Sequence, residues 1–166
     1  MLPARDRPAS PGRSAQAALR RSLASPFGPL TLVERGGKIV ALEWGGKAAD
    51  VSPLLTEAAR QLSDYFARRR EAFDLPLAPE GTKDEKKLWA RMTKIPFGKT
   101  ATYGELAREL GQVPRQLGQA CGRNPIPIVI PCHRVVGAGG ALTGYSAPGG
   151  VETKRRLLAF EGALLL

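Results

Sequence analysis

A proline-punctuated apolar segment, residues 124–136, constrains the fold of this chain more than any other feature. It reads NPIPIVIPCHRVV, with Pro125, Pro127 and Pro131 spaced through a run of isoleucine and valine. Proline lacks a backbone N–H and restricts its own φ, so the segment cannot be a helix and is poor as a central strand. We therefore predict a buried, extended segment of fixed backbone that delivers Cys132 to a defined position.

Cys132 is followed by the only histidine of the chain, His133, and then by Arg134. A thiol is a weak nucleophile at neutral pH unless a neighbouring group takes its proton. Adjacent residues of an extended chain point in opposite directions, so direct contact between Cys132 and His133 requires a turn. The pattern therefore favours a water molecule between the thiol and the imidazole.

A helix predicted over VETKRRLLAFEG and ending at Gly162 supplies a candidate third member. Glu161 lies three and four residues after Leu158 and Leu157, so it shares their inward face. A buried carboxylate is unfavourable unless it is paired. Paired with His133, it would orient the imidazole and raise its basicity, as in a catalytic triad. The alternative, a helix-end residue at the edge of the core, remains open.

Only two cysteines, Cys121 and Cys132, are present, and no Cys/His cluster offers a metal site. Two thiols are too few for a disulfide framework. We therefore expect a reducing, cytoplasmic setting and neither metal nor other cofactor. No apolar run approaches the ~20 residues that a membrane span needs, so no membrane association is expected.

The chain divides into three predicted regions. Residues 1–24, rich in Arg, Pro, Ser and Ala, are predicted to be a basic flexible leader. Residues 25–80 are predicted to form a small α/β scaffold domain that carries no recognisable chemistry. The stretch FDLPLAPEG, residues 73–81, is a short extended link, and residues 81–166 form the second domain.

The scaffold domain has two clear local signals. Apolar and polar residues alternate around Gly36-Gly37, which predicts a hairpin with strands near 29–35 and 38–44. A helix follows, with Ser52 as its cap and Pro53 in its first turn.

In the second domain, two T-x-x-E capping boxes, at residues 82–85 and 102–105, each open a helix. Gly111 ends the second of these helices, and a third runs from Pro114 to about Gly122. Two short helices joined by a tight turn indicate a helix-turn-helix, although any corner between two helices gives a similar pattern.

The outer face of this third helix is flat, with an arginine at each end. Such a face suits close approach to DNA, with one long side chain inserted into the base stack. Alternatively, Gly118 simply lets the helix pack tightly on its neighbour, and the pattern favours neither interpretation. The residues concerned are Arg115, Gln116, Gly118, Gln119, Gly122 and Arg123.

The basic residues are unevenly distributed within a net charge of +10. Residues 1–81 carry 12 Lys/Arg against 9 Asp/Glu, a net +3, whereas residues 82–166 carry 13 against 6, a net +7. This excess favours a polyanionic partner for the second domain, but a merely soluble surface explains it equally well.

Taken together, PCHRVV, the preceding NP, the following GYS and the closing LLAFEG resemble the O6-alkylguanine-DNA alkyltransferase family. The resemblance is close over residues 95–162 and looser back to about residue 25. It implies an α/β N-terminal scaffold domain and a mainly α C-terminal domain with a helix-turn-helix (winged-helix-like) DNA-binding unit. One departure is Asp84, which stands where the family usually has an aromatic residue.

The resemblance assigns catalytic roles residue by residue. Cys132 would accept the alkyl group, and His133 would act as the base through a water molecule. Glu161 would hold His133, and Asn124 would brace the turn between the recognition helix and the active-site segment. Tyr103 would donate to guanine N3 as the leaving base gains charge.

Substrate and DNA contacts follow in the same way. Tyr145 would wall the pocket, the Ser146 N–H would face O6, and the Val135 carbonyl would accept from the exocyclic amine. Arg115 would replace the flipped nucleotide in the stack. The remaining minor-groove contacts would come from Gln116, Gly118, Gln119, Gly122 and Arg123.

The implied activity is repair of duplex DNA by a monomer that is consumed in one turnover, with O6-alkylguanine and also O4-alkylthymine as substrates. Two other hypotheses remain: a sensor that flips damaged guanine without repair, and a helix-turn-helix regulator with an incidental buried cysteine. Sensors of that kind lack the acceptor thiol. A regulator gives no reason for His133, Glu161 and Tyr145 at their spacings.

Overall fold

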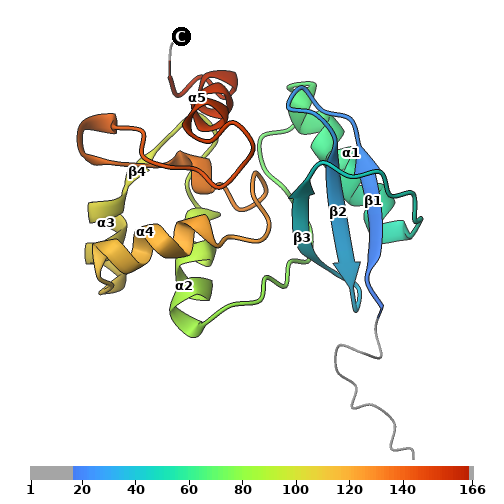
Figure 1. Ribbon diagram of the computed structural model, residues 1–166, viewed down its shortest axis with the longest axis horizontal. Coiled ribbons are helices and arrows are strands. Elements are labelled where there is room, and N and C mark those ends of the chain that lie inside the picture. Colours follow the sequence, from blue (N-terminus) through green and yellow to red (C-terminus); the bar gives the residue numbers. More distant parts are fainter. Residues whose placement is uncertain (1–16, 165–166) are drawn as a thin grey trace, which may run out of the picture.

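The computed structural model describes residues 17–164, which form two domains lying side by side (Figure 1). In the N-terminal domain, helix α1 packs against an antiparallel sheet of strand order β1-β2-β3. Its elements are β1 (Leu19–Leu23), β2 (Leu30–Arg35), β3 (Lys38–Trp44) and α1 (Pro53–Phe66). A single apolar core runs from this sheet through α1 into the C-terminal domain, so the two domains share one interior.

The C-terminal domain is mainly helical. Its strands β4 and β5 form a short parallel pair, which places the start of α3 beside the residues that follow Cys132. Its elements are α2 (Lys83–Met92), β4 (Ala101–Thr102), α3 (Tyr103–Leu110), α4 (Pro114–Gly122), the 3₁₀ turns η2 (Cys132–Arg134) and η3 (Ala138–Gly140), β5 (Val135–Val136) and α5 (Val151–Phe160). The predicted two-domain fold is therefore confirmed. Within residues 17–164, no helix is long and apolar enough to cross a membrane.

The predicted hairpin is confirmed as β2 and β3, with Arg35 opposite Lys38. Gly36 and Gly37 both have positive φ values, 62° and 77°. A two-residue turn of this kind matches the twist of the flanking strands, and glycine adopts it without steric cost. The pair therefore sets the register of the sheet.

The predicted leader of residues 1–24 is wrong at its C-terminal end, because Leu19–Leu23 form β1 and pair with β2. Residues 1–16 lie outside the described residues. The sequence LRRSL hid the strand, since Arg20 and Arg21 interrupt the expected alternation. Both arginines lie on an edge strand, where charged side chains are common; Arg20 Nη1 contacts Glu43 Oε1 at 2.6 Å.

Helix α1 begins as predicted. The Ser52 side chain accepts from the Leu55 backbone N–H at 3.0 Å, and Pro53 occupies the first turn. The buried face includes Leu55, Leu62 and Tyr65, all 0% exposed. Burying a side chain the size of Leu62 contributes roughly 1.5–3 kcal/mol, so this face holds the helix on the sheet. Its last turn brings Tyr65 towards the C-terminal domain.

The helix-turn-helix is confirmed as α3 and α4. Gly111 ends α3 with φ 65°, the left-handed conformation that lets the chain reverse at once. The box at Thr82 forms both of its hydrogen bonds. At Thr102 only half of the motif forms: its hydroxyl accepts from the Glu105 N–H, and the Glu105 carboxylate contacts that hydroxyl.

The proline-rich segment turns instead of running extended, which corrects the prediction for residues 126–130. The Ile130 N–H donates to the Ile126 carbonyl at 2.9 Å, and Ile128 has φ 73°, which is rare for a β-branched residue. Asn124 braces this turn as predicted: its Nδ2 donates to the Ile130 carbonyl and its Oδ1 accepts from the Ile126 N–H. The prolines limit the backbone but do not dictate an extended path.

Candidate active site

A cavity of about 560 Å³ lies between α4, the start of α3, the loop before α5 and α5 itself. Eight of the residues predicted from sequence line it, together with Cys121 and Lys154. Those eight predicted residues are Cys132, Asn124, Tyr103, Tyr145, Ser146, Arg115, Gly118 and Gly122. The cavity is bounded by the two regions predicted to carry chemistry and DNA binding, so one concave site joins them.

The Cys132 side chain forms part of the cavity wall and is only 7% exposed. Burial raises the pKa of its thiol, and the neighbouring Asn124, Lys154 and Tyr145 only partly offset that effect. The group is therefore a neutral thiol at rest. It needs a base before it can act as a nucleophile.

His133 is fully buried behind the cysteine, in the turn η2. Its Nε2 lies 2.8 Å from Glu161 Oε2. Burial lowers the pKa of His133 and outweighs the opposing effect of Glu161, so the imidazole is neutral. Because a carboxylate only accepts hydrogen bonds, Nε2 carries the proton and donates it to Glu161.

The other ring nitrogen, Nδ1, is buried without a hydrogen-bond partner among residues 17–164. No hydrogen bond within this range joins His133 to the Cys132 thiol. Nδ1 is therefore the one ring atom that can accept a proton. This agrees with the expectation that the two adjacent side chains do not contact each other directly.

Glu161 is 4% exposed and completes a dense ionic cluster. Arg134 binds it with two hydrogen bonds, Nε to Oε1 and Nη2 to Oε2, both 2.8 Å. Burial alone would raise the pKa of Glu161, but hydrogen bonds from His133 and Arg134 hold it well below its usual range. The carboxylate is thus ionised. The predicted His133–Glu161 pair is present, and Glu161 is also the C-cap of α5.

Sequence reasoning missed Arg134 and Tyr65 as partners of Glu161. The Tyr65 hydroxyl donates to Glu161 Oε2 at 2.6 Å across the domain boundary. Arg134 Nη1 also donates to the Ile95 carbonyl at 2.6 Å. Neither contact has a sequence signal. The partners are far apart in the chain, and the sequence does not distinguish a buried arginine from an exposed one.

Lys154 was also missed, although a signal existed. It precedes Leu157 and Leu158 by three and four residues, the same spacing that identified Glu161. Lys154 is 1% exposed, and its Nζ contacts the Tyr103 hydroxyl at 3.3 Å and the Thr143 carbonyl at 3.2 Å. Burial lowers its pKa. Its positive charge faces the cavity and favours an anionic sulfur on Cys132.

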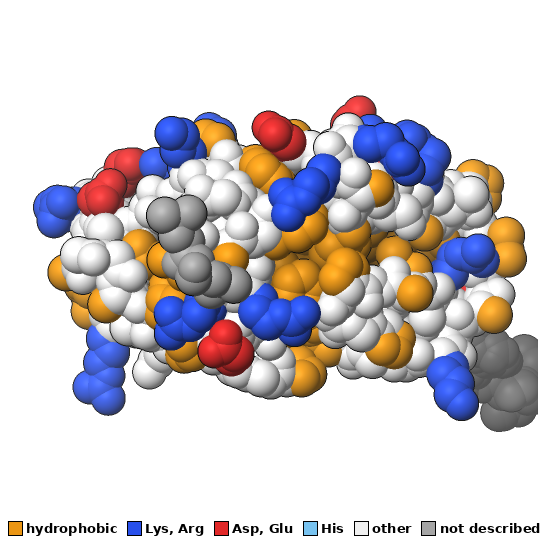
Figure 2. Space-filling model, turned by 90° about the horizontal axis from the view of Figure 1, so that it is seen from above, with side chains coloured by type: hydrophobic (Ala, Val, Ile, Leu, Met, Phe, Trp, Pro, Cys, Tyr) orange, Lys and Arg blue, Asp and Glu red, His pale blue; other side chains and the backbone are white. Residues whose placement is uncertain are grey.

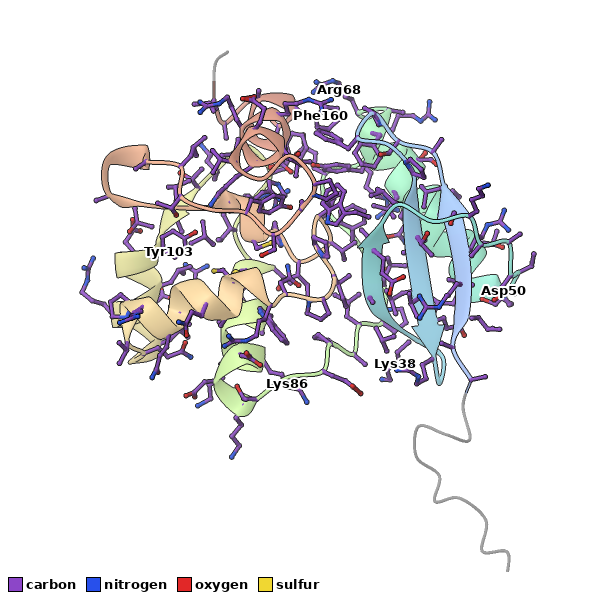
Figure 3. All side chains as sticks on the ribbon, in the orientation of Figure 1. Lys38, Asp50, Arg68, Lys86, Tyr103 and Phe160 are labelled. Carbon is purple, nitrogen blue, oxygen red and sulfur yellow. The ribbon has the colours of Figure 1, made fainter. Side chains whose placement is uncertain are left out.

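The predicted substrate contacts are partly brought together. Tyr103, Tyr145 and Ser146 all line the cavity. Tyr103 lies at the start of α3 (Figure 3). Burial raises the pKa of Tyr103, which keeps its hydroxyl a proton donor. Val135 is not among the lining residues; its side chain is buried in β5, opposite Ala101. The role of its carbonyl stays a prediction.

Helix α4 divides its predicted DNA contacts between two sides. Arg115, Gly118 and Gly122 line the mouth of the cavity. The other three border a separate hollow beside the start of α2, and one of them is already engaged, since Arg123 Nε lies 2.5 Å from Glu85 Oε2. These three are Gln116, Gln119 and Arg123.

Gly118 does not serve close helix packing. Apart from its chain neighbours and the backbone of its own helix, no described atom lies within 4 Å of the position where its Cβ would be. The packing interpretation left open by the sequence is therefore wrong, and there is open space beside Gly118 at the mouth of the cavity. A partner could approach the backbone closely at this point.

Cys121 lines the same cavity from the end of α4. Its sulfur lies 3.8 Å from Met92 Sδ, and burial raises the pKa of Cys121 to about 12. Of the two thiols, only Cys132 is next in the chain to the single histidine, His133.

Comparison with known proteins identifies the family of this chain. Two family models match: the ribonuclease-like domain of 6-O-methylguanine DNA methyltransferase at residues 19–79, and its DNA-binding domain at residues 83–163. A methylated-DNA–protein-cysteine methyltransferase of Methanosarcina acetivorans is 44% identical over 150 residues, covering 84% of this chain and 95% of the relative. That of Mycobacterium tuberculosis is 39% identical, covering 85% and 90%.

Among solved structures, OGT of Mycobacterium tuberculosis in complex with DNA matches with a TM-score of 0.78 and 39% identity, covering 87% of this chain and 92% of that one. The O6-methylguanine methyltransferase of the same organism, solved separately, matches with a TM-score of 0.76 and 36% identity. Because these alignments cover 87% and 89% of this chain, they extend over both domains. The chain belongs to the 6-O-methylguanine DNA methyltransferase family.

Proposed function

We propose that this protein repairs duplex DNA by moving the alkyl group of O6-alkylguanine onto Sγ of its own Cys132, in a single irreversible turnover. The observation that carries the proposal is the alignment of a buried thiol, a neutral imidazole and an ionised carboxylate behind a cavity that opens beside α4. Family membership supports the same reaction. O4-alkylthymine is proposed as a second substrate.

The thiol proton leaves first. His133 Nδ1 accepts it through a bridging water, and Glu161 stabilises the imidazolium that forms. The sulfur anion then attacks the alkyl carbon, so a carbon–sulfur bond forms as the carbon–oxygen bond breaks. Lys154 favours the anionic sulfur before attack. The product is a thioether, which has no leaving group for the reverse reaction, and the protein is consumed.

The guanine must leave without a full negative charge. The Tyr103 hydroxyl is proposed to donate to N3, and the Ser146 N–H to face O6. The Val135 carbonyl is proposed to accept from the exocyclic amine, and Tyr145 to wall the pocket. Each donor reduces the charge that develops on the leaving base, which is where preorganised hydrogen bonds accelerate such reactions.

Access to the target requires the nucleotide to leave the helix, at a cost of a few kcal/mol. Helix α4 is proposed to lie in the minor groove, with the open backbone at Gly118 against the DNA. Arg115, at the mouth of the cavity, is proposed to take the place of the flipped nucleotide. Gln116, Gln119, Gly122 and Arg123 would supply further contacts. The protein is proposed to act as a monomer in the cytoplasm, a reducing setting that keeps Cys132 a thiol.

Intact-mass spectrometry after incubation with an O6-methylguanine oligonucleotide tests this proposal. We expect one methyl increment per chain, mapped to the peptide that contains Cys132, and an unmodified guanine in the DNA. A sensor would bind the oligonucleotide without a mass change, and a regulator would not distinguish it from undamaged DNA. Either result would overturn the proposal.

A further inference from the structure

The boundary between the domains carries an aromatic cluster close to the ionic cluster of the active site. Seen from above, hydrophobic side chains gather between the two lobes with Lys and Arg around them (Figure 2). Arg68 and Phe160 lie together at this boundary (Figure 3): the Arg68 guanidinium stands 4.1 Å from the ring centre and donates to the Phe160 carbonyl. Phe66 packs on Phe160 at 6.0 Å.

Tyr65 lies at the centre of this cluster and is 0% exposed. Its ring packs against rings of both domains, at centroid distances of 5.0–6.0 Å. These contacts hold the ring in place and would serve a phenylalanine equally well. The hydroxyl is different: its hydrogen-bond partner is Glu161 Oε2, at 2.6 Å. The four neighbouring rings are those of Phe66, Phe73, Phe97 and Phe160. Ring packing therefore explains why an aromatic residue stands at position 65, but it does not explain the hydroxyl group.

Glu161 Oε2 is the oxygen to which His133 Nε2 donates. The Tyr65 hydroxyl and Arg134 Nη2 reach the same atom, while Arg134 Nε holds Oε1. With both oxygens engaged, the carboxylate has one orientation towards the imidazole. We infer that Tyr65 of the N-terminal domain is a positioning residue of the transfer reaction, whose hydroxyl holds and partly neutralises the carboxylate that orients His133. This inference rests on the proposed function.

The effect on His133 has a definite direction. A donor to Glu161 withdraws charge from the carboxylate, so the carboxylate stabilises an imidazolium less. Without the hydroxyl, Glu161 would attract the protonated imidazole more strongly, and the pKa of His133 would rise. Removal of the hydroxyl leaves the other charged or titratable side chains that face His133 and Glu161 in place. These side chains come from η2, α5 and the loop before α5, and they are Arg134, Cys132, Lys154 and Tyr145.

Tyr65→Phe keeps the ring and removes the hydroxyl. Because transfer of the Cys132 proton to His133 needs a neutral imidazole, the acid limb of the rate–pH profile should move to higher pH. Free benzylguanine is the substrate, so that DNA binding does not enter. At the pH where the wild type runs at half its maximal rate, the variant should be about fivefold slower, for a hydrogen bond that contributes about tenfold. On the alkaline plateau the two rates should agree within about twofold, since both then have a neutral base.

Nuclear magnetic resonance gives a second readout that does not depend on activity. His133 is the only histidine, so its imidazole signal titrates without overlap. We expect its apparent pKa to be higher in Tyr65→Phe than in the wild type. Site-specific 3-fluorotyrosine at position 65 retains the ring and is a stronger donor, so it should shift the pKa downwards. This replacement keeps the test available if the phenylalanine variant does not fold.

Phe66→Leu is the matched control, because it disturbs the same aromatic cluster without touching Glu161. It should lower the melting temperature and leave both the rate profile and the His133 titration in place. Equal shifts in Phe66→Leu, or no shift in the two Tyr65 variants, would show that Tyr65 is only a packing residue. If the wild-type protein does not accept the benzyl group from benzylguanine, the proposed function is wrong. The pKa of His133 measured by titration would still show whether the Tyr65 hydroxyl acts on Glu161.

Discussion

The two walls of the cavity are built in opposite ways. The inner wall, which includes Cys132 of η2 and Lys154 of α5, is buried. In the adjoining Glu161 cluster, the hydrogen-bonding groups are engaged apart from His133 Nδ1. The outer wall, formed by the accessible face of α4, has the exposed Arg115 at the mouth of the cavity and open space at Gly118. A rigid interior suits chemistry that needs fixed geometry, whereas a bare surface suits a partner that supplies its own shape.

This contrast predicts that changes to the inner wall slow transfer from every substrate, whereas changes to the outer wall slow only the reaction with DNA.

The largest loss of activity is expected at the proposed alkyl acceptor, Cys132. Cys132→Ala should abolish transfer to benzylguanine and to alkylated DNA, because the other thiol, Cys121, is not next to the histidine in the chain, and should retain DNA binding. Cys121→Ala is the control and should transfer at near the wild-type rate. A methyl increment found on Cys121 in peptide mapping would contradict the assignment.

The second largest loss of activity is expected for variants of His133 and Glu161, the residues proposed to take the thiol proton and to stabilise the resulting imidazolium. His133→Ala should slow transfer by about 10²- to 10⁴-fold, as expected for loss of a general base. The double variant with Glu161→Gln should be no slower than the slower single variant, because residues that act as a unit are not additive. Single-turnover rates on benzylguanine measure both. If the rate reduction in the double variant equals the product of the two single reductions, Glu161 does not act through His133.

Glu161→Gln should also cost stability, which the sequence alone did not indicate. The change leaves the buried Arg134 without its anionic partner, a loss of about 3–5 kcal/mol. Urea unfolding measures it, and His133→Ala, which keeps the Arg134–Glu161 pair, should lose less. Equal losses would show that Arg134 finds another partner.

Arg115→Ala tests the outer wall. Extruding a nucleotide costs a few kcal/mol, so repair of duplex DNA should slow about 10- to 100-fold while reaction with free benzylguanine stays unchanged. Lys99→Ala, at an exposed position outside the cavity lining, is a control for loss of charge. Equal losses on both substrates would place Arg115 in the chemistry instead of the DNA interface.

The smallest expected effect is at Gly118. Gly118→Ala should stabilise the fold by up to about 1 kcal/mol, because alanine favours a helix and no described atom opposes a Cβ there. The methyl group should nevertheless stand between α4 and DNA and weaken duplex binding, with benzylguanine transfer unchanged. Thermal unfolding and a binding titration measure the two sides. Unchanged DNA affinity would mean that DNA does not approach the backbone at this residue.

Local patterns predicted much of the fold, and the reason lies in short-range chemistry. Gly36-Gly37 needs positive φ, Ser52 caps the next residues, and Gly111 reverses the chain, all within a few residues. The same holds for Glu161, whose burial followed from its spacing to two leucines. Strand β1 was missed because its pairing with β2, and not its own sequence, makes it a strand. The turn at residues 126–130 was missed because prolines allow more than one backbone path.

The sequence by itself indicated the groups to which we assign the chemistry: a thiol, one imidazole, a carboxylate with helical spacing to the core, and a basic second domain. Only the tertiary structure decided how they are held. Arg134 and Tyr65 reach Glu161 from 27 and 96 residues away along the chain. Such contacts leave no periodic or local trace, because each arises from the packing of separate elements. The protonation of His133 and Cys132 is set in the same way, by burial that exists only in the folded protein.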